Sequence, residues 1–323
     1  MVDCTKTVIV TGPTATGKTA LAIKLADKYD GEIVSIDSRQ VYRGMDIGTG
    51  KDLDEYNFQG KRIPYHMLDI VEPEYPYNLM EFCRDTWQAI EGINVSKRLP
   101  ILCGGTALYL DALISGYELP GAEPDFERRE KLKSKTVDEL GQLLQTEFPE
   151  AYDKLKDKTN KTRLLRALER AEAPQRKLTT PPVKLQPLLL GVYFPRKEVH
   201  KRIELRLDGR LDAGMIEEVQ HLHDNGVSWK RLDFFGLEYR YISEYLQGKC
   251  SRDEMRDKLL IKIRQFAKRQ DIWFRKLERE GWVIHWVPEG DFKQAAKLVD
   301  AFMNNAPLPS PEIQLKDIDY GRK

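Results

Sequence analysis

The stretch TGPTATGKTA, from Thr11 to Ala20, has the residue types and the spacing of a phosphate-binding loop. Its pattern is Gly-x4-Gly-Lys-Thr, and its members are Gly12, Pro13, Thr14, Ala15, Thr16, Gly17, Lys18 and Thr19. In such a loop the backbone N–H groups surround phosphate oxygens, the lysine adds a positive charge, and the final hydroxyl is a ligand for Mg²⁺. The chain is therefore predicted to hold a polyphosphate, although the loop alone does not say what happens to it.

Two further polar segments follow apolar runs. Asp37 comes at the end of one run, and Thr106 comes after the pair Gly104 and Gly105 at the end of another. A carboxylate beside a phosphate site serves as a Mg²⁺ ligand through water or as a general base. Structural interpretations compete with these roles, because Asp37 is also a good helix cap and a glycine pair before threonine makes an ordinary capped turn. Taken alone, both segments leave the choice open.

The elements that must position these residues alternate between apolar runs and amphipathic helical patterns. Helices are predicted at residues 18–30 and 78–93, and the aromatic-rich segment FFGLEYRYISEYL at 234–246 is predicted to be one packed helix. Strands are predicted at residues 7–12, 31–37, 65–71, 99–105, 188–194 and 282–287. This alternation is typical of a parallel sheet with helices on both faces, whose carboxyl edge binds ligands. The predicted fold class is α/β: a P-loop NTPase-like parallel sheet core, an inserted helical domain and a largely helical C-terminal part.

The insertion is recognised by a change in composition. Residues 126–173 are highly charged and have helical periodicity without a strand pattern, and a proline-rich stretch at 173–187 indicates an exposed linker. The expected domains are the first part of the core at 1–120, the insertion at 121–184, the rest of the core with the C-terminal helices at 185–306, and a tail at 307–323. From Asn304 onward the chain is expected to be loosely ordered.

Composition restricts the class of protein. Of the 323 residues, 41% are hydrophobic, which favours a folded globular chain, and the net charge of +1 means that a nucleic-acid surface must be a local patch. The four cysteines contain no CxxC pair, which fits a reduced cytosol. A strand pattern begins too early for a signal peptide, and no run has the length of a membrane span. We expect a cytoplasmic protein without membrane contact.

Three classes of protein use a phosphate-binding loop in different ways: switch GTPases, kinases that move a phosphoryl group, and transferases that expel diphosphate. A GTPase requires an N/T-K-x-D motif to read guanine. The nearest match, TNKT, has Thr162 in place of the aspartate, so the guanine-reading motif is incomplete. The kinase and the transferase both place cations around a polyphosphate, so the residues considered so far do not separate them.

Five motifs together resemble those of the tRNA dimethylallyltransferases of the MiaA type, the IPP transferase family. They extend over about residues 7–287 and are GPTATGKT, DSRQVYRGMDIGTGK, CGGTALYLDAL, TRLLRALE and RQFAKRQDIWFR. The resemblance implies transfer of a dimethylallyl group from dimethylallyl diphosphate to the exocyclic amine of the adenosine next to the tRNA anticodon. The diphosphate held by the loop is then the leaving group.

The resemblance also implies roles for single residues. Lys18, with Mg²⁺ on Thr19, would hold the diphosphate, Asp37 would take the proton of the amine, and Thr106 would orient that amine. Arg202 and Arg206, four apart on one predicted helix face, would add cations to the diphosphate site, although such pairs are often only solvated. Contacts with tRNA are implied for Asp37, Ser38, Arg39, Gln40, Thr106, Arg128, Arg163 and Arg166.

The segment 258–276 is the clearest basic element, with Asp271 as its single acid. An apolar stripe of Leu259, Ile263, Phe266, Trp273 and Leu277 is predicted to pack on the core. By the resemblance its polar residues would contact tRNA, namely Lys268, Arg269, Gln270 and Arg275. Gln270 falls inside the apolar stripe, so a local structural role is equally open.

Two alternatives remain. An isopentenyltransferase that acts on free adenine nucleotides is the nearest, and a small-molecule kinase is more distant. The helical insertion and the basic helix favour tRNA, because a free nucleotide needs neither. Departures from the family pattern at 235–239 (FGLEY) and at Ile263 put local tRNA contacts in doubt, but not the prenyl chemistry. The expected partners are the tRNA anticodon loop and dimethylallyl diphosphate, and the expected oligomeric state is a monomer.

Overall fold

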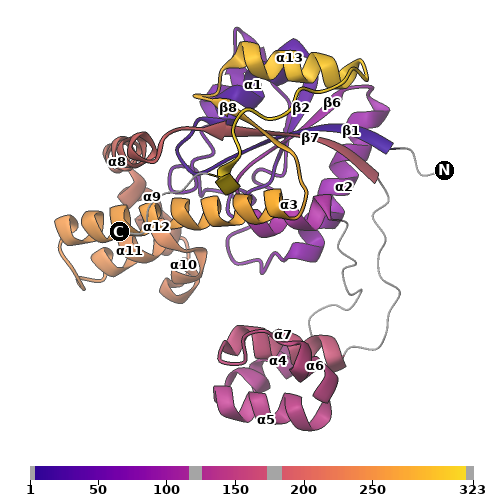
Figure 1. Cartoon of the computed structure of the whole chain (residues 1–323). Helices are drawn as coiled ribbons and strands as arrows, with labels where there is room; N and C mark the ends of the chain where they lie inside the picture. Colours follow the sequence, from indigo (N-terminus) through magenta and orange to yellow (C-terminus); the bar gives the residue numbers. More distant parts are fainter. Residues whose placement is uncertain (1–3, 116–125, 173–183, 318–323) are drawn as a thin grey trace. The chain divides into compact units, whose positions relative to one another are not determined.

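A computed structural model describes residues 4–115, 126–172 and 184–317. The chain divides into two compact units (Figure 1). The first consists of residues 1–115 together with 182–323, and the second of residues 116–181. The predicted linker at 173–187 lies outside the described residues up to Val183, and its last four residues belong to a strand. Within the described ranges, none of the helices is long and apolar enough to cross a membrane.

The first unit is built on a six-stranded sheet in the order β5-β2-β6-β1-β7-β8. Every neighbouring pair in this sheet is parallel. Its strands are β1 (Cys4–Thr11), β2 (Gly31–Ser35), β5 (Tyr65–His66), β6 (Leu99–Cys103), β7 (Lys184–Tyr193) and β8 (Ile284–Pro288). A separate antiparallel pair joins β3 (Asn57–Phe58) to β4 (Lys61–Arg62). The prediction of an α/β fold with a parallel sheet core is confirmed.

Helices cover the two faces of this sheet (Figure 1). On one face, α1 (Lys18–Lys28) and α13 (Phe292–Met303) pack on a cluster that includes Val8 and Val10 of β1. Ile9 points the other way because side chains alternate along a strand, and it is fully buried as well. Burial on both faces explains why the strands are continuous apolar runs. On the opposite side lie α2 (Leu79–Val95) and α3 (Ala107–Ile114).

The C-terminal part of the first unit is mainly helical, as predicted. It contains α8 (Arg196–Asp212), α9 (Met215–Asp224), α10 (Trp229–Phe235), α11 (Leu237–Leu246) and α12 (Arg252–Arg279). The first unit also has two short 3-10 helices, η1 (Leu53–Tyr56) after β2 and η2 (Leu315–Asp317) after α13. Helix α12, the longest of the C-terminal part, begins with a capping box in which Ser251 and Glu254 satisfy each other's backbone N–H groups. It contacts α8, α11 and α3, and so connects the helical part with the sheet.

In the second unit, the described residues 126–172 form four helices, α4 (Phe126–Lys133), α5 (Val137–Glu147), α6 (Pro149–Lys154) and α7 (Lys161–Glu172). Residues 126–172 are thus helical without a strand, as their charge and periodicity predict. The helices share a small apolar core, which contains Leu132, Leu140, Leu144, Leu164, Ala167 and Leu168. This unit therefore has a hydrophobic core of its own, separate from the one under the sheet.

Two predicted elements are wrong in extent. The strand predicted at 65–71 is reduced to Tyr65–His66, because Met67 and Asp69 adopt positive φ angles of 65° and 54° that end the extended backbone. The single packed helix predicted across FFGLEYRYISEYL is broken into α10 and α11 at Gly236, whose φ is 103°. Both departures depend on left-handed backbone at single positions, which hydrophobic periodicity does not report.

The expectation of loose order from Asn304 onward is also wrong for the described residues up to Asp317. Leu315 is only 1% exposed, and the Glu278 carboxylate on α12 accepts hydrogen bonds from the backbone N–H groups of Leu315 (3.1 Å) and Lys316 (2.7 Å). The same carboxylate accepts the indole N–H of Trp286 on β8 at 2.6 Å. One buried acid therefore attaches the C-terminal segment to the core.

Replacing Glu278 by alanine is expected to lower the free energy of unfolding by about 3 kcal/mol, because it leaves buried donors without an acceptor. Urea unfolding of the two proteins measures the difference. Glu280→Ala, at the exposed end of the same helix, is the matched control and should change stability by less than about 1 kcal/mol. Equal effects of the two substitutions would contradict the anchoring role of Glu278.

Candidate functional site

The phosphate-binding loop has the backbone that its sequence predicts. It joins the end of β1 to α1, and Gly12, Ala15 and Gly17 have positive φ angles of 140°, 64° and 82°. A Cβ atom at Gly12 would lie 2.8 Å from the carbonyl oxygen of Val192 on β7, so a side chain has no room there. Gly17 is the N-cap residue of α1, so the N-terminal end of that helix, with its positive dipole, faces the loop.

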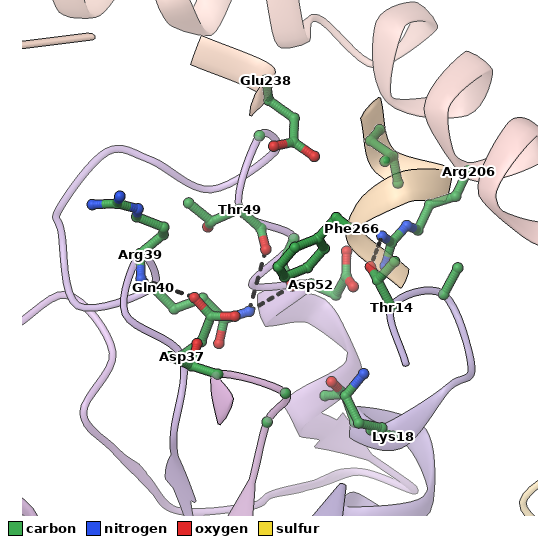
Figure 2. A pocket seen from close by; sticks show the side chains of 18 of the residues that line it. Thr14, Lys18, Asp37, Arg39, Gln40, Thr49, Asp52, Arg206, Glu238 and Phe266 are labelled. Atoms are coloured by element: carbon green, nitrogen blue, oxygen red, sulfur yellow. Dashed lines mark hydrogen bonds between the residues drawn. The ribbon is translucent and has the colours of Figure 1, made fainter. Parts of the chain in front are cut away.

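A cavity of about 750 Å³ opens beside this loop, and many predicted site residues line it (Figure 2). The elements that meet here are the loops after β1, β2 and β6, and the helices α8, α11 and α12. Among the predicted residues, the lining includes Thr14, Ala15, Gly17, Lys18, Thr19, Asp37, Ser38, Arg39, Gln40, Thr106, Arg202, Arg206, Arg269 and Gln270. The cavity thus lies at the carboxyl edge of the parallel sheet.

Cations from two elements gather around the loop. Lys18 Nζ donates to the carbonyl of Pro13 at 2.8 Å, and Arg202 Nε donates to the carbonyl of Ala15 at 2.8 Å. The Arg206 guanidinium donates to the hydroxyl of Thr14. Arg202 and Arg206 therefore reach the loop from one face of α8, and are not merely solvated charges.

Burial makes these charges costly in the absence of an anion. It lowers the pKa of Lys18 to about 8, and burial together with the neighbouring Arg210 lowers the pKa of Arg206 to about 9. A bound anion would offset this cost, because a negative charge favours the protonated forms. The electrostatics of this side of the cavity thus favour a polyanion such as a diphosphate.

Asp37 and Thr106, the residues predicted to act on the acceptor amine, also line this cavity. Asp37 follows β2, and its carboxylate accepts the backbone N–H of Arg39 at 2.8 Å. Thr106 precedes α3, and its hydroxyl accepts the backbone N–H of Ser38 at 3.2 Å. The two predicted catalytic side chains are thereby connected through neighbouring residues of one loop. Both line the cavity that contains Lys18.

Two residues predicted to contact tRNA have partners inside the protein. The Gln40 amide donates to the carbonyl of Gly50 at 2.9 Å and accepts from the hydroxyl of Ser35 at 2.8 Å. Arg39 donates to the carbonyl of Phe234 at 3.0 Å and lies over the Phe234 ring, and burial lowers its pKa. Gln40 holds the loop around the cavity, and both residues also line the cavity itself.

Sequence reasoning missed three further residues that line the cavity. Arg210 lies four residues after Arg206 on α8, and this helical spacing was a signal that could have identified it. Glu238 at the start of α11 directs its carboxylate into the cavity (Figure 2), and burial raises its pKa. Phe266 of α12 also lines the cavity and is labelled in the same view. No sequence pattern distinguishes Glu238 from an ordinary helix-start acid.

The apolar stripe of α12 is divided between the core and the cavity. Leu259 and Leu277 are fully buried as predicted, but Ile263 and Phe266 line the cavity. Trp273 is only half-buried, and the aromatic residue that fills the core is its neighbour Phe274, which is 0% exposed. The helical phase of the prediction was therefore slightly wrong for the aromatic residues.

The basic residues of α12 have different surroundings. Lys268 and Arg269 are exposed, and Arg269 also reaches the large cavity, whereas Lys268 borders a small one beside Asp271. Arg275 is half-buried, and Arg264 donates to Glu204 on α8 at 2.8 Å. Lys268 and Arg269 are therefore more open to contact with a large partner than Arg264 and Arg275 are.

The three predicted arginines of the insertion lie in the second unit. Arg128 forms a bidentate pair with Glu172, with N–O distances from 2.5 to 3.2 Å, and so links α4 to α7. Arg163 lies 3.5 Å from Asp157, and Arg166 is exposed. Arg163 and Arg166 are thus on the surface of this unit, while Arg128 also has a structural partner.

The residues present fit a Mg²⁺ ion that the substrate helps to bind. Within the described ranges, no three His, Cys, Asp or Glu side chains are grouped so as to hold a metal ion. Thr19 and Asp37 nevertheless line the cavity beside Lys18. Mg²⁺ commonly takes few protein ligands and completes its shell with phosphate oxygens and water, so Thr19 is sufficient as a first protein ligand.

Known proteins resemble this chain over most of its length. The family model described as IPP transferase matches residues 40–277, and that described as Isopentenyl transferase matches residues 5–68. The tRNA dimethylallyltransferase 1 of Syntrophus aciditrophicus (strain SB) is 48% identical over 293 residues, which cover 90% of this chain and 95% of that protein.

Two solved structures extend the comparison to the fold. The full-length tRNA isopentenylpyrophosphate transferase of Bacillus halodurans is 30% identical, with a TM-score of 0.68, and the match covers 94% of this chain and 98% of that one. A eukaryotic dimethylallyltransferase acting on tRNA has a TM-score of 0.79 over 95% of this chain and 81% of its own. At 23% identity, this second likeness concerns the fold alone.

Proposed function

The chain belongs to the IPP transferase family, and we propose from this premise that it is a tRNA dimethylallyltransferase. It transfers a dimethylallyl group from dimethylallyl diphosphate to the exocyclic amine of the adenosine next to the tRNA anticodon, and releases diphosphate. The observation that best supports this chemistry is that one cavity is lined both by cations suited to a diphosphate and by polar groups suited to an amine. Half-buried cations surround the phosphate-binding loop, and Asp37 and Thr106 line the same cavity.

The cations favour departure of the leaving group. As the bond between the allylic carbon and oxygen breaks, negative charge builds on the diphosphate, and positive groups already in place stabilise it. Lys18 holds one such charge, and Arg202 and Arg206 hold two more on α8. When bound at Thr19, Mg²⁺ would supply additional positive charge to the diphosphate oxygens.

The acceptor side must activate a weak nucleophile. The adenine amine shares its lone pair with the ring, so it attacks more readily when a base takes its proton as the new bond forms. Asp37 lines the cavity and would take this proton, and the Thr106 hydroxyl would orient the amine. The adenosine must leave its stack to enter such a site, as in other enzymes that act on bases.

A tRNA substrate requires a second surface that holds the anticodon loop by its phosphates. The exposed Lys268 and Arg269 on α12 are suited to this role, and so are Arg163 and Arg166 on the surface of the second unit. Ser38 and Arg39, at the cavity, would contact the nucleotide that enters it. A cytoplasmic location and a monomeric state belong to the same proposal.

One assay tests the proposed activity against its alternatives. Radiolabelled dimethylallyl diphosphate is incubated with the protein and with tRNA, AMP or ATP as acceptor. Label is expected in tRNA, at the adenosine next to the anticodon. Label in AMP or ATP alone would instead identify an adenine-nucleotide isopentenyltransferase. Transfer of the γ-phosphoryl group of ATP to a small molecule, without prenyl transfer, would identify a kinase.

Replacing Lys268 and Arg269 together by alanine is expected to weaken tRNA binding and to flatten its salt dependence. Each lost phosphate contact reduces the slope of log K against log salt by roughly 0.7–0.9. Affinity for dimethylallyl diphosphate should remain, because the diphosphate has cations of its own. Filter binding of tRNA at several salt concentrations measures the slope.

A matched control removes two exposed lysines elsewhere in the same unit. Lys293→Ala with Lys297→Ala, on α13, changes the net charge equally and should leave the slope unaltered. Melting curves of both double variants show whether folding is affected. If the Lys268/Arg269 variant melts normally and keeps the original slope, α12 is not part of the RNA-binding surface.

A further inference from the structure

Gln270 on α12 is a buried amide that joins two loops of the cavity. Its side chain is 5% exposed. Oε1 accepts the backbone N–H of Thr14 at 2.8 Å, and Nε2 donates to the carbonyl of Gly105 at 2.9 Å. These loops follow β1 and β6, which are neighbours in the sheet. The amide thus connects the loops that follow two neighbouring strands.

The packing around this bridge is close. A Cβ atom at Gly105 would lie 2.6 Å from Gln270 Nε2 and 3.1 Å from the carbonyl oxygen of Gly12, so the approach of the amide requires glycine. On the other loop, Thr14 is held a second time, because its hydroxyl accepts from Arg206 of α8. Two helices therefore fix the position of Thr14 from two sides.

The two bridged loops carry the two reacting partners of the proposed reaction. The loop with Thr14 also holds Lys18, which serves the diphosphate. The turn with Gly105 leads directly into Thr106, whose hydroxyl is bonded to the loop of Asp37. The distance between the allylic carbon and the attacking amine therefore depends on how these loops lie relative to each other.

We propose that Gln270 is a positioning residue, which holds the phosphate-binding loop and the Gly104–Thr106 turn in register and so aligns donor and acceptor. This inference rests on the proposed function. Misplacement by about 1 Å can cost roughly 10²-fold in rate even when both substrates remain bound. The amide oxygen of Gln270 is bonded to Thr14, and one of its amide N–H groups is bonded to Gly105. Because these bonds hold protein loops, loss of Gln270 should affect the rate of the chemical step more than the binding of either substrate.

The experiment breaks the bridge from each end. Gln270→Leu keeps the size of the side chain but removes both hydrogen bonds, and Gly105→Ala pushes the amide away without changing α12. Gln265→Leu, at an exposed glutamine of the same helix, is the matched control. Single-turnover rates are measured at saturating donor and tRNA, and the Kd values for tRNA and for inorganic pyrophosphate are measured separately.

Both bridge variants are expected to lose roughly 10- to 100-fold in single-turnover rate. Their Kd values for tRNA and for pyrophosphate should change by less than about threefold, and the control should match the wild type in all three quantities. A weaker tRNA Kd with an unchanged rate would overturn the proposal in favour of a direct RNA contact. A lower Tm with an unchanged rate of the folded protein would overturn it in favour of a structural role.

Amide hydrogen exchange provides a second readout that needs no substrate. The Thr14 N–H should exchange faster in Gln270→Leu than in the wild type and in Gln265→Leu, because its acceptor is gone. Unchanged exchange at Thr14 would overturn the bridging role of Gln270, whatever the protein catalyses. A wild-type protein that transfers no label to tRNA would instead overturn the proposed function, so the two failures are distinguishable.

Discussion

Replacing Lys18 by alanine is expected to lower the rate of dimethylallyl transfer by roughly 10²–10³-fold, close to the limit of detection. The Lys18 ammonium lies within the phosphate-binding loop, where its Nζ reaches the carbonyl of Pro13, and burial already lowers its pKa to about 8. A charge held in so dry a site interacts strongly with an anion. Its removal should therefore act on the departing diphosphate and leave tRNA affinity largely intact.

The measurement compares the transfer rate at saturating donor with the tRNA Kd. Lys24→Ala, at an exposed lysine of the same helix α1, controls for loss of charge and should behave like the wild type. Unchanged turnover in Lys18→Ala would disprove the assignment of the phosphate-binding loop to the diphosphate. ATP should not be required in this assay, and a strict need for it would restore the kinase hypothesis.

The phosphate-binding loop and the parallel core were predictable because local sequence determines them. Gly12 and Gly17 are needed where φ is positive, and buried strands between helices produce continuous apolar runs. Asp37 and Thr106 could be placed at the same edge since both follow strands of one parallel sheet. Their functional roles came from resemblance rather than from these physical patterns.

Other features depend on contacts between distant segments, which no local pattern contains. Gln270 is 256 residues from Thr14 along the chain, and only the packing of α12 against the loops defines its role. Leu315 is buried because Glu278 binds its backbone. Arg264 is paired with Glu204, although both look like ordinary surface charges in the sequence. Such pairings follow from the fold and could not be predicted before it was known.

Replacing Asp37 by asparagine is expected to lower kcat by about 10²–10⁴-fold, the usual contribution of a general base. Asparagine has nearly the same shape, and its amide oxygen can still accept the N–H of Arg39, which the carboxylate accepts at 2.8 Å. The loop should therefore keep its conformation, and tRNA should bind as before. What the substitution removes is the ability to take a proton from the adenine amine as it attacks.

Asp52→Asn is the matched control, since Asp52 lines the same cavity and lies 4.0 Å from Arg210 without a place in the proposed proton transfer. It should change kcat by less than about tenfold. Single-turnover rates with pre-bound tRNA, measured over a range of Mg²⁺ concentrations, separate the two roles open to Asp37. A general base predicts a low rate at every Mg²⁺ concentration. If the Asp37→Asn rate recovers fully when Mg²⁺ is raised, the carboxylate is a metal ligand, and the proton must leave the amine by another route.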